Sequence, residues 1–130
     1  MAKKEVRTTQ APAAVGPYSQ AVVANGFVFV SGQIPLDPAT GALIESTDIA
    51  LQTERVLQNV EAVLAGAGSE MNDVVKATLF LADMADFRTV NETYARYFSE
   101  GVKPARAAVQ VAALPLGSRI EIEVIALARS

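Results

Sequence analysis

The alternation of apolar and charged residues near the end of the chain constrains the fold more than any other feature. Ile120, Ile122 and Val124 fall on one side of an extended strand, and Glu121 and Glu123 fall on the other. A period of two residues predicts a strand with one face against a core. The opposite face carries charge, so it requires water or another subunit beside it.

Turn signals and hydrophobic periodicity divide the rest of the chain into strands and helices. Asn-Gly is the preferred dipeptide of a two-residue hairpin turn, and apolar residues at helical spacing mark two helices. The predicted elements are two strands around Asn25-Gly26, a helix over Ser46–Ala65, a strand over Val74–Ala82, a helix from about Asp86 that ends before Gly101, and strands over Arg106–Ala112 and Ser118–Ala128. This order, β-β-α-β-α-β-β, predicts the α+β class, in which a mixed β-sheet carries two helices on one face.

The second face of this sheet is expected to be polar and uncovered by helices. The strand before the last one places Arg106, Ala108 and Gln110 on one face. If the helices cover the isoleucine face, small and polar side chains line the other face. The chain is 51% hydrophobic and 19% charged, which is apolar for a small monomer that must expose much of its surface. The sequence therefore predicts a homo-oligomer whose sheets face one another.

Length and charge narrow the classes of protein that fit this chain. Its 130 residues fit a single domain over residues 1–130. The net charge is −3 and the basic residues are scattered, so nucleic acid is a poor partner. The first residues lack the apolar region of a signal peptide, and no stretch approaches the roughly 20 apolar residues of a membrane span. We therefore expect a cytoplasmic protein with no membrane partner.

Histidine and cysteine are both absent, and their absence excludes several chemistries. Without cysteine there is no disulfide, thiol nucleophile or thiolate metal site. Without histidine the usual general base near neutral pH is missing, as are Ser-His-Asp arrangements and most transition-metal sites. Any chemistry must use carboxylates, arginine, lysine, tyrosine, hydroxyls, backbone groups and water.

Arg106 stands alone in the apolar stretch Pro-Ala-Arg-Ala-Ala-Val. A guanidinium buried without an anion is costly, so two interpretations stay open. Arg106 forms a salt bridge with Glu121, Glu123 or a carboxylate of another subunit, or it binds a substrate carboxylate through two hydrogen bonds. The glutamates likewise either lie on a solvated face as partners for Arg119 and Arg106, or one of them holds and deprotonates a water in a dry interface that raises its pKa.

Tyr18, Ser31 and Asn91 are less specific candidates. Tyr18 follows Gly-Pro and either closes the edge of the core or lines a pocket. Ser31 ends a predicted strand, where its hydroxyl either makes a turn or faces a site. Asn91 lies inside the second predicted helix, where such residues are usually solvated or bonded to their own helix.

Several blocks, in order from about Ala11 to the end of the chain, resemble one known family. The blocks are APAAVGPYSQAV, VSGQIPLDPATG, ALQTERVLQNVEAVLAGAG, DVVKATLFLADMADF, VNETYARYF and KPARAAVQVAALPLGSRIEIEVIAL. They resemble the Rid/YjgF family, and specifically its RidA branch of enamine/imine deaminases. The resemblance implies a chorismate-mutase-like α+β fold and a homotrimer whose sheets form an inner β-barrel, with sites in clefts between subunits.

The resemblance also implies an activity, the hydrolysis of reactive 2-imino acids to 2-keto acids and ammonia. Such imines derive from 2-aminoacrylate and 2-aminocrotonate, which pyridoxal-phosphate-dependent dehydratases release. The deaminase itself needs no cofactor and no metal. Two other functions stay open: a regulatory trimer that binds small carboxylates such as 2-keto acids without turnover, and a chaperone, ribonuclease or translation inhibitor of the kind attributed to some relatives.

Carried over residue by residue, the resemblance assigns roles to the candidates. Arg106 matches the arginine that binds the substrate carboxylate, and Glu121 matches the glutamate that positions and activates water, while Glu123 stays structural. Ala108 departs from the pattern, because many relatives carry Cys or Thr there. An alanine side chain offers no hydrogen bond, so this position can contribute to substrate binding only through its backbone. The remaining pocket-lining matches are Tyr18 (from the neighbouring subunit), Ser31, Gly32 and Asn91.

Overall fold

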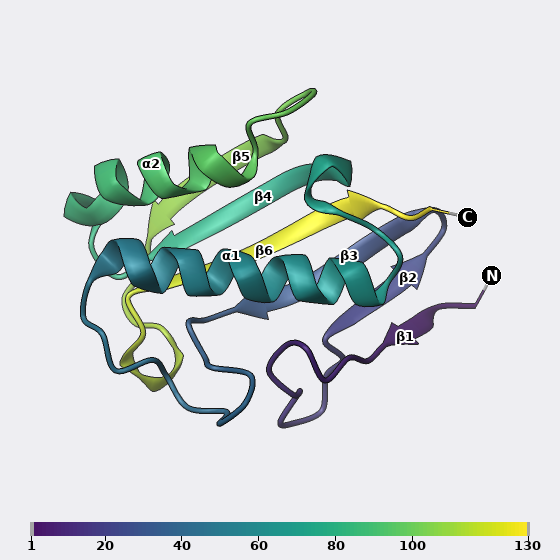
Figure 1. Cartoon of the computed structure of the whole chain (residues 1–130), viewed down its shortest axis with the longest axis horizontal. Coiled ribbons are helices and arrows are strands. Elements are labelled where there is room, and N and C mark those ends of the chain that lie inside the picture. The colour runs from purple at the N-terminus through teal and green to yellow at the C-terminus, as the bar shows by residue number, and fades with distance from the viewer. Residues whose placement is uncertain (1, 130) are drawn as a thin grey trace.

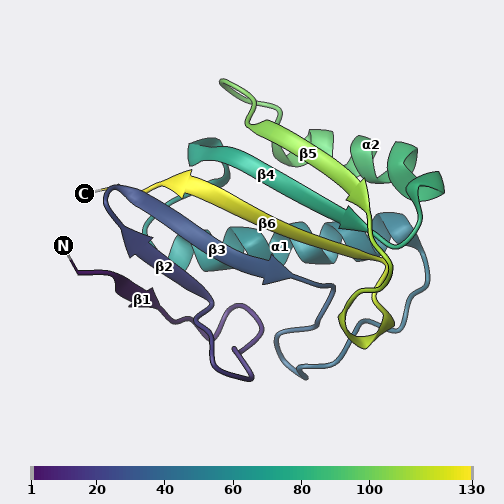
Figure 2. The ribbon, with the colours of Figure 1, turned by 180° about the vertical axis from the view of Figure 1, so that it is seen from behind.

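The computed structural model describes residues 2–129, which build one six-stranded mixed sheet with helices on one face. The strands lie in the order β1-β2-β3-β6-β4-β5. Both helices cover the same face (Figure 1), and the view from behind shows the opposite face without a helix over it (Figure 2). This architecture confirms the predicted α+β class. The elements are β1 (Lys4–Val6), β2 (Ala21–Ala24), β3 (Phe27–Gln33), α1 (Ile49–Gly66), β4 (Val74–Leu81), α2 (Phe87–Tyr97), β5 (Ala105–Gln110) and β6 (Ile120–Leu127), with short 3-10 turns η1 (Met71–Asp73), η2 (Met84–Asp86) and η3 (Pro115–Gly117).

The predicted elements all occur, with differences at their ends and one addition. Helix α1 begins after Asp48, whose side chain accepts hydrogen bonds from backbone N–H groups of the first turn. Asn25 and Gly26 have φ angles of 51° and 85°, as a two-residue hairpin turn with positive φ requires. Strand β1 was not predicted, because a three-residue strand with two charged residues shows too little alternation. It pairs antiparallel with β2 at the edge of the sheet.

The core lies between the sheet and the helices. Val56, Val60 and Leu64 of α1 are fully buried, as are Ile120 and Ile122 of β6. The glutamates of β6 point to the other face, so the predicted alternation of this strand is confirmed. Within residues 2–129, no helix is both long enough and apolar enough to cross a membrane.

Strand β5 presents a different face from the one predicted. It runs parallel to β4, with Arg106 beside Ala77 and Ala108 beside Leu79. Ala77 and Leu79 are fully buried in the core, and directly paired residues point to the same face of a sheet, so Arg106 and Ala108 face the helices. The expectation that they share the open face with the glutamates of β6 is wrong. Alanine occupies both sides of this short strand, so its sequence carried too little contrast to reveal its orientation.

The open face of the sheet carries exposed apolar side chains besides the glutamates of β6. Phe29 of β3, Val109 of β5 and Leu127 of β6 are 45%, 44% and 46% exposed, respectively. Strand pairing places all three on the side opposite the core. Several large apolar side chains exposed on one surface are typical of an interaction surface.

Candidate functional site

Arg106 is held against one side of α2. Its guanidinium carbon lies 4.9 Å from the centre of the Tyr94 ring and 5.4 Å from the centre of the Phe87 ring, which are cation–π distances. Its Nη1 donates a hydrogen bond to Asn91 Oδ1 over 2.6 Å. Phe87, Asn91 and Tyr94 are spaced by four and three residues, so they share one side of the helix. We call these three residues the arginine seat, because they orient an exposed guanidinium.

Among residues 2–129, Arg106 forms no ion pair with a carboxylate. Glu121 and Glu123 of β6 lie beside Phe80 and Thr78 of β4, respectively, on the face of the sheet opposite the arginine seat. The interpretation that Arg106 forms a salt bridge with Glu121 or Glu123 of the same chain is therefore wrong. A ligand or a carboxylate of another subunit remains as the anion for this guanidinium.

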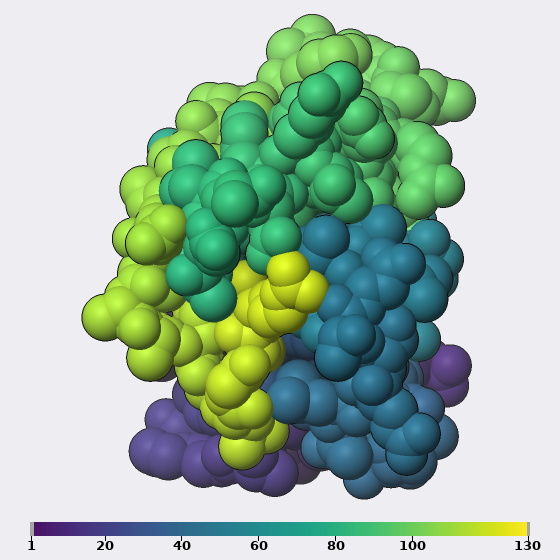
Figure 3. Space-filling view, turned by 90° about the vertical axis from the view of Figure 1, so that its left-hand side faces the viewer, coloured from purple at the N-terminus to yellow at the C-terminus, as the bar shows by residue number. Residues whose placement is uncertain are grey.

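Arg119 binds Asp86 rather than the strand glutamates that were predicted as its partners. Its Nη2 donates to both carboxylate oxygens of Asp86, over 2.8 and 2.7 Å, and its Nη1 donates to the Thr47 carbonyl over 2.6 Å. Figure 3 shows the result, with the start of β6 (yellow) between the α2 region (green) and the segment leading into α1 (blue). This contact fixes the end of α2 at which the arginine seat begins.

Glu121 lies on the open face of β6 and is half-buried. Burial raises the pKa of its carboxyl group, and the negative charge of Glu123 raises it further. A carboxylate whose pKa is raised toward neutrality is a better proton acceptor for catalysis near neutral pH. The surroundings of Glu121 therefore fit those of a general base that holds a water molecule.

A β-bulge interrupts β3 beside this glutamate. The pairing register between β3 and β6 shifts between Val30 and Gln33, so Ser31 and Gly32 together occupy the place of one residue. Bulges bend a strand and change the direction of nearby side chains. Here the bulge brings the backbone of Gly32 directly against the Glu121 side chain.

Ser31 connects the bulge to the segment that carries Tyr18. Its backbone N–H donates to the Gln20 carbonyl over 3.0 Å, and its hydroxyl donates to the Ser19 carbonyl over 2.6 Å. The buried side-chain amide of Gln20 donates in turn to two backbone carbonyls of the preceding loop. Tyr18 itself is 51% exposed. The Ser31 hydroxyl thus supports the loop, and the Tyr18 ring is accessible to a neighbouring molecule.

One chain therefore contains two separate groups of candidate residues. Strand β4 lies between β5 and β6, and Arg106 and Glu121, which define the two groups, point to opposite faces of the sheet. The first can bind an anion, and the second can hold water and accept a proton, but neither can do both. We call them the arginine half-site, which consists of Arg106, Asn91, Phe87, Tyr94 and Ala108, and the glutamate half-site, which consists of Glu121, Gly32, Ser31 and Tyr18.

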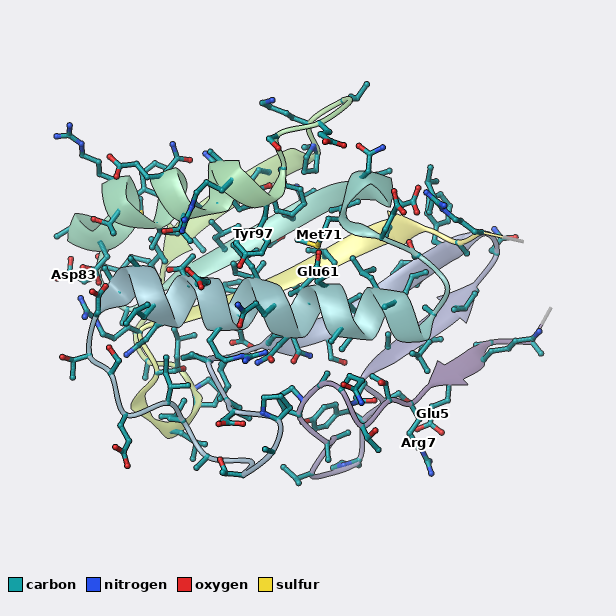
Figure 4. The ribbon with its side chains drawn as sticks, viewed as in Figure 1. Glu5, Arg7, Glu61, Met71, Asp83 and Tyr97 are labelled. Carbon is teal, nitrogen blue, oxygen red and sulfur yellow. The ribbon has the colours of Figure 1, made fainter. Side chains whose placement is uncertain are left out.

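Two hollows in the surface lie apart from the predicted catalytic residues. One, of about 290 Å³, lies between α1 and the end of α2, where Glu61 and Tyr97 approach one another (Figure 4). The other, of about 910 Å³, is lined in part by Glu5 and Arg7 near β1 (Figure 4) and includes Tyr18. Within residues 2–129, no group of three or more acidic side chains is arranged to hold a metal ion. Neither hollow includes both half-sites.

Sequence reasoning missed the two aromatic members of the arginine seat. Phe87 and Tyr94 belong to the apolar residues whose helical spacing predicted this helix, and no further role was predicted for them. Tyr94 is indeed buried, and burial raises the pKa of its hydroxyl, although the charge of Arg106 opposes that shift. The available signal was their spacing around Asn91, since two rings and an amide on one side of a helix fit a guanidinium.

The fold and the half-sites define a class of protein: a six-stranded α+β sheet with an oriented guanidinium at one edge and a half-buried carboxylate on its open face. The family model described as Endoribonuclease L-PSP matches residues 8–128. The chain is 54% identical over 129 residues to Protein DfrA of Myxococcus xanthus, covering 98% of this chain and 97% of that protein. It is 52% identical over 125 residues to 2-iminobutanoate/2-iminopropanoate deaminase of Mus musculus, covering 96% and 91%.

A solved structure agrees with these relatives. The Rid protein YyfA of Yersinia pestis is similar with a TM-score of 0.94 and 48% identity, covering 97% of this chain and 99% of that one. The chain belongs to the Rid/YjgF family, which confirms the predicted family. The names of its relatives are mixed, and they include a deaminase, an endoribonuclease description and a name without an activity.

Proposed function

We propose that this chain is a deaminase that hydrolyses reactive 2-imino acids to 2-keto acids and ammonia. The observation that carries the proposal is the arginine seat, which presents an exposed guanidinium in a fixed orientation. A guanidinium binds a carboxylate through two parallel hydrogen bonds. The mouse relative is named for 2-imino acids, and each of these carries a carboxylate beside the C=N bond.

The complete site is proposed to form between subunits of a homotrimer. Within one chain the two half-sites point to opposite faces of the sheet, so a single chain cannot close both around one small substrate. The apolar side chains exposed on the open face, Phe29, Val109 and Leu127, support burial against other copies of the same sheet. Three such sheets facing inward give the chorismate-mutase-like inner barrel, and the accessible Tyr18 ring lies at the edge of a site.

The proposed mechanism divides the work between the half-sites. Arg106 of one subunit binds the substrate carboxylate and thereby places C2 next to the water held by Glu121 of its neighbour. Glu121 accepts a proton from this water as the oxygen bonds to C2 of the protonated imine, and the C=N electron pair moves to nitrogen. Glu121 then returns the proton to the nitrogen of the carbinolamine, which becomes an ammonium group. The hydroxyl gives its proton to Glu121 as the C=O bond forms and the C–N bond breaks, which releases ammonia.

The remaining residues support these two groups. Asn91 accepts a hydrogen bond from Arg106 and so directs the rest of its guanidinium outward. Ala108 lies in the arginine half-site beside Leu79, where its backbone but not its side chain can form a hydrogen bond with the substrate. A general base of this kind contributes about 10²–10⁴-fold, which suits an imine carbon that is already electrophilic.

A coupled assay tests the proposal. A threonine dehydratase generates the imine in the presence of semicarbazide, which traps it. The wild-type protein is expected to lower the amount of trapped imine and to increase the rate of 2-keto acid formation. Glu121→Gln should keep ligand binding and lose this effect. If the wild-type protein binds 2-ketobutyrate in calorimetry yet leaves trapping unchanged, it is a carboxylate-binding regulator and not a deaminase.

The endoribonuclease description of the family is tested in the same preparations. The net charge of −3 and the absence of histidine give the chain neither a phosphate-binding surface nor the usual acid and base for RNA cleavage. We expect no cleavage of RNA by highly purified protein. Cleavage that disappears in Arg106→Ala would contradict the assignment of this half-site to imino acids.

A further inference from the structure

Gly32 lies where the Glu121 side chain leaves no room for another side chain. A Cβ atom on Gly32 would lie 2.8 Å from Glu121 Cδ and 3.1 Å from Glu121 Cγ. Carbon atoms in contact are normally about 3.5–4.0 Å apart. All three of the nearest atoms to this position belong to Glu121, so the obstruction comes from one side chain and not from the backbone.

Backbone conformation does not explain the glycine. Gly16, Gly26, Gly41, Gly68, Gly101 and Gly117 all adopt positive φ angles, a region that favours glycine. Gly32 does not, so alanine fits its backbone conformation. What alanine does not fit is the space above the bulge, because that space holds the carboxyl group of Glu121.

We propose that Gly32 is a positioning residue, whose missing side chain lets Glu121 lie across the β-bulge in the place where it acts as base. This inference rests on the proposed function, and it explains why the Glu121 carboxyl group lies where it does. The bulge contributes because it puts two residues in the place of one and brings the Gly32 backbone beneath the carboxyl group. Glu121 can then lie close to the sheet, where it is half-buried.

An alanine at position 32 would push Glu121 away from the sheet. The side chain would have to turn away from position 32 and toward solvent, because the three atoms nearest to the added Cβ all belong to Glu121. A more hydrated carboxyl group loses the burial that raises its pKa, and a water held by it moves away from the substrate carbon. The arginine half-site lies on the opposite face of the sheet and stays unchanged.

Kinetics and titration of Gly32→Ala test the proposal. We expect kcat for imine hydrolysis to fall at least about tenfold, because a general base contributes about 10²–10⁴-fold, while KM changes less than threefold. Carbon-13 NMR of the side-chain carboxyls should show the Glu121 titration moving to lower pH. Gly66→Ala is the matched control, since Gly66 also lacks a positive φ and lies outside both half-sites, and it should leave kcat unchanged. An unmoved Glu121 titration or a kcat within twofold of wild type would overturn the role of Gly32.

A stability cycle keeps the inference testable without any enzyme activity. If Gly32→Ala lowers Tm through its contact with Glu121, the double variant Gly32→Ala/Glu121→Ala should regain most of the loss. A double variant as unstable as Gly32→Ala would overturn the proposal, even if the single variant fails to fold. Failure of the wild-type protein to hydrolyse imines would contradict the proposed function, whereas the titration and the cycle would still decide the role of Gly32.

Discussion

Replacement of Arg106 by lysine separates the shape of the guanidinium from its charge. Lysine keeps the positive charge, but a single ammonium group can neither form two parallel hydrogen bonds with a carboxylate nor stack as a planar group on aromatic rings. In the structure the guanidinium carbon lies 4.9 Å from the Tyr94 ring and 5.4 Å from the Phe87 ring, with Nη1 bonded to Asn91. Lysine therefore loses one hydrogen bond to the substrate and the orientation that the arginine seat provides.

The expected loss follows from these contacts. One hydrogen bond to a charged group contributes about 1.5–3 kcal/mol, and an exposed cation–π contact contributes about 0.5–1 kcal/mol. Their sum, about 2–4 kcal/mol, corresponds to roughly 30- to 900-fold in kcat/KM, since 1.36 kcal/mol is tenfold. Most of it should appear in KM, because Arg106 binds the carboxylate equally in the substrate and in the transition state.

Initial rates of 2-keto acid formation from enzymatically generated 2-iminobutanoate measure this loss. Arg88→Lys is the control, because Arg88 also lies on α2 but its side chain is 93% exposed and its contact with Glu92 is 3.8 Å long. We expect Arg88→Lys to match wild type, and both variants to keep the wild-type Tm. A kcat/KM for Arg106→Lys within threefold of wild type would refute two-point binding of the carboxylate.

Three further predictions concern titration and stability. Glu123→Gln removes a charge that raises the pKa of Glu121, so the acid limb of the kcat profile, along which activity is lost as pH falls, should move to lower pH; an unmoved limb would show that another group titrates. A hydrogen bond and the charge of Arg129 lower the pKa of Asp73, so the stability that this pair contributes is present above the ordinary carboxyl pKa of about 3.9 and is lost as pH falls through the lower folded pKa. Arg129→Met should therefore weaken the acid dependence of Tm, and a wild-type acid profile would count against the pair. Asn59 is fully buried and donates to two backbone carbonyls of the loop after β3. Asn59→Ala should lower the free energy of unfolding in urea by about 2 kcal/mol or more, because buried polar groups lose their partners; a change below about 0.5 kcal/mol would contradict this role.

The parts of the fold that could be predicted are those with strong local contrast. In β6, buried isoleucines alternate with glutamates, so both the strand and its faces are apparent from the sequence. Asn25-Gly26 marks the hairpin because two positive φ angles are needed there. The predicted helix over Ser46–Ala65 likewise begins at a residue type that caps helices, since Asp48 accepts backbone hydrogen bonds from the first turn of α1.

The parts that could not be predicted depend on which strands become neighbours. Arg106 faces α2 because β5 pairs in parallel with β4, and nothing within Ala-Arg-Ala-Ala-Val-Gln indicates that pairing. The arginine seat could therefore be identified only from the tertiary structure. The bulge at Ser31-Gly32 also depends on the pairing of two strands. The need for glycine at position 32 comes from Glu121, which is distant in the sequence, so no local pattern indicates it.

The central claim is that one catalytic site combines Arg106 of one subunit with Glu121 of another, and complementation between inactive subunits tests it most directly. Arg106→Met and Glu121→Gln proteins are each expected to be nearly inactive, and they are mixed in equal amounts, dissociated and reassembled. If sites form between subunits, random assortment restores both residues in about a quarter of the sites, so the mixture should recover up to about 25% of wild-type activity. Reassembled mixed oligomers that stay as inactive as the two separate variants would contradict the account.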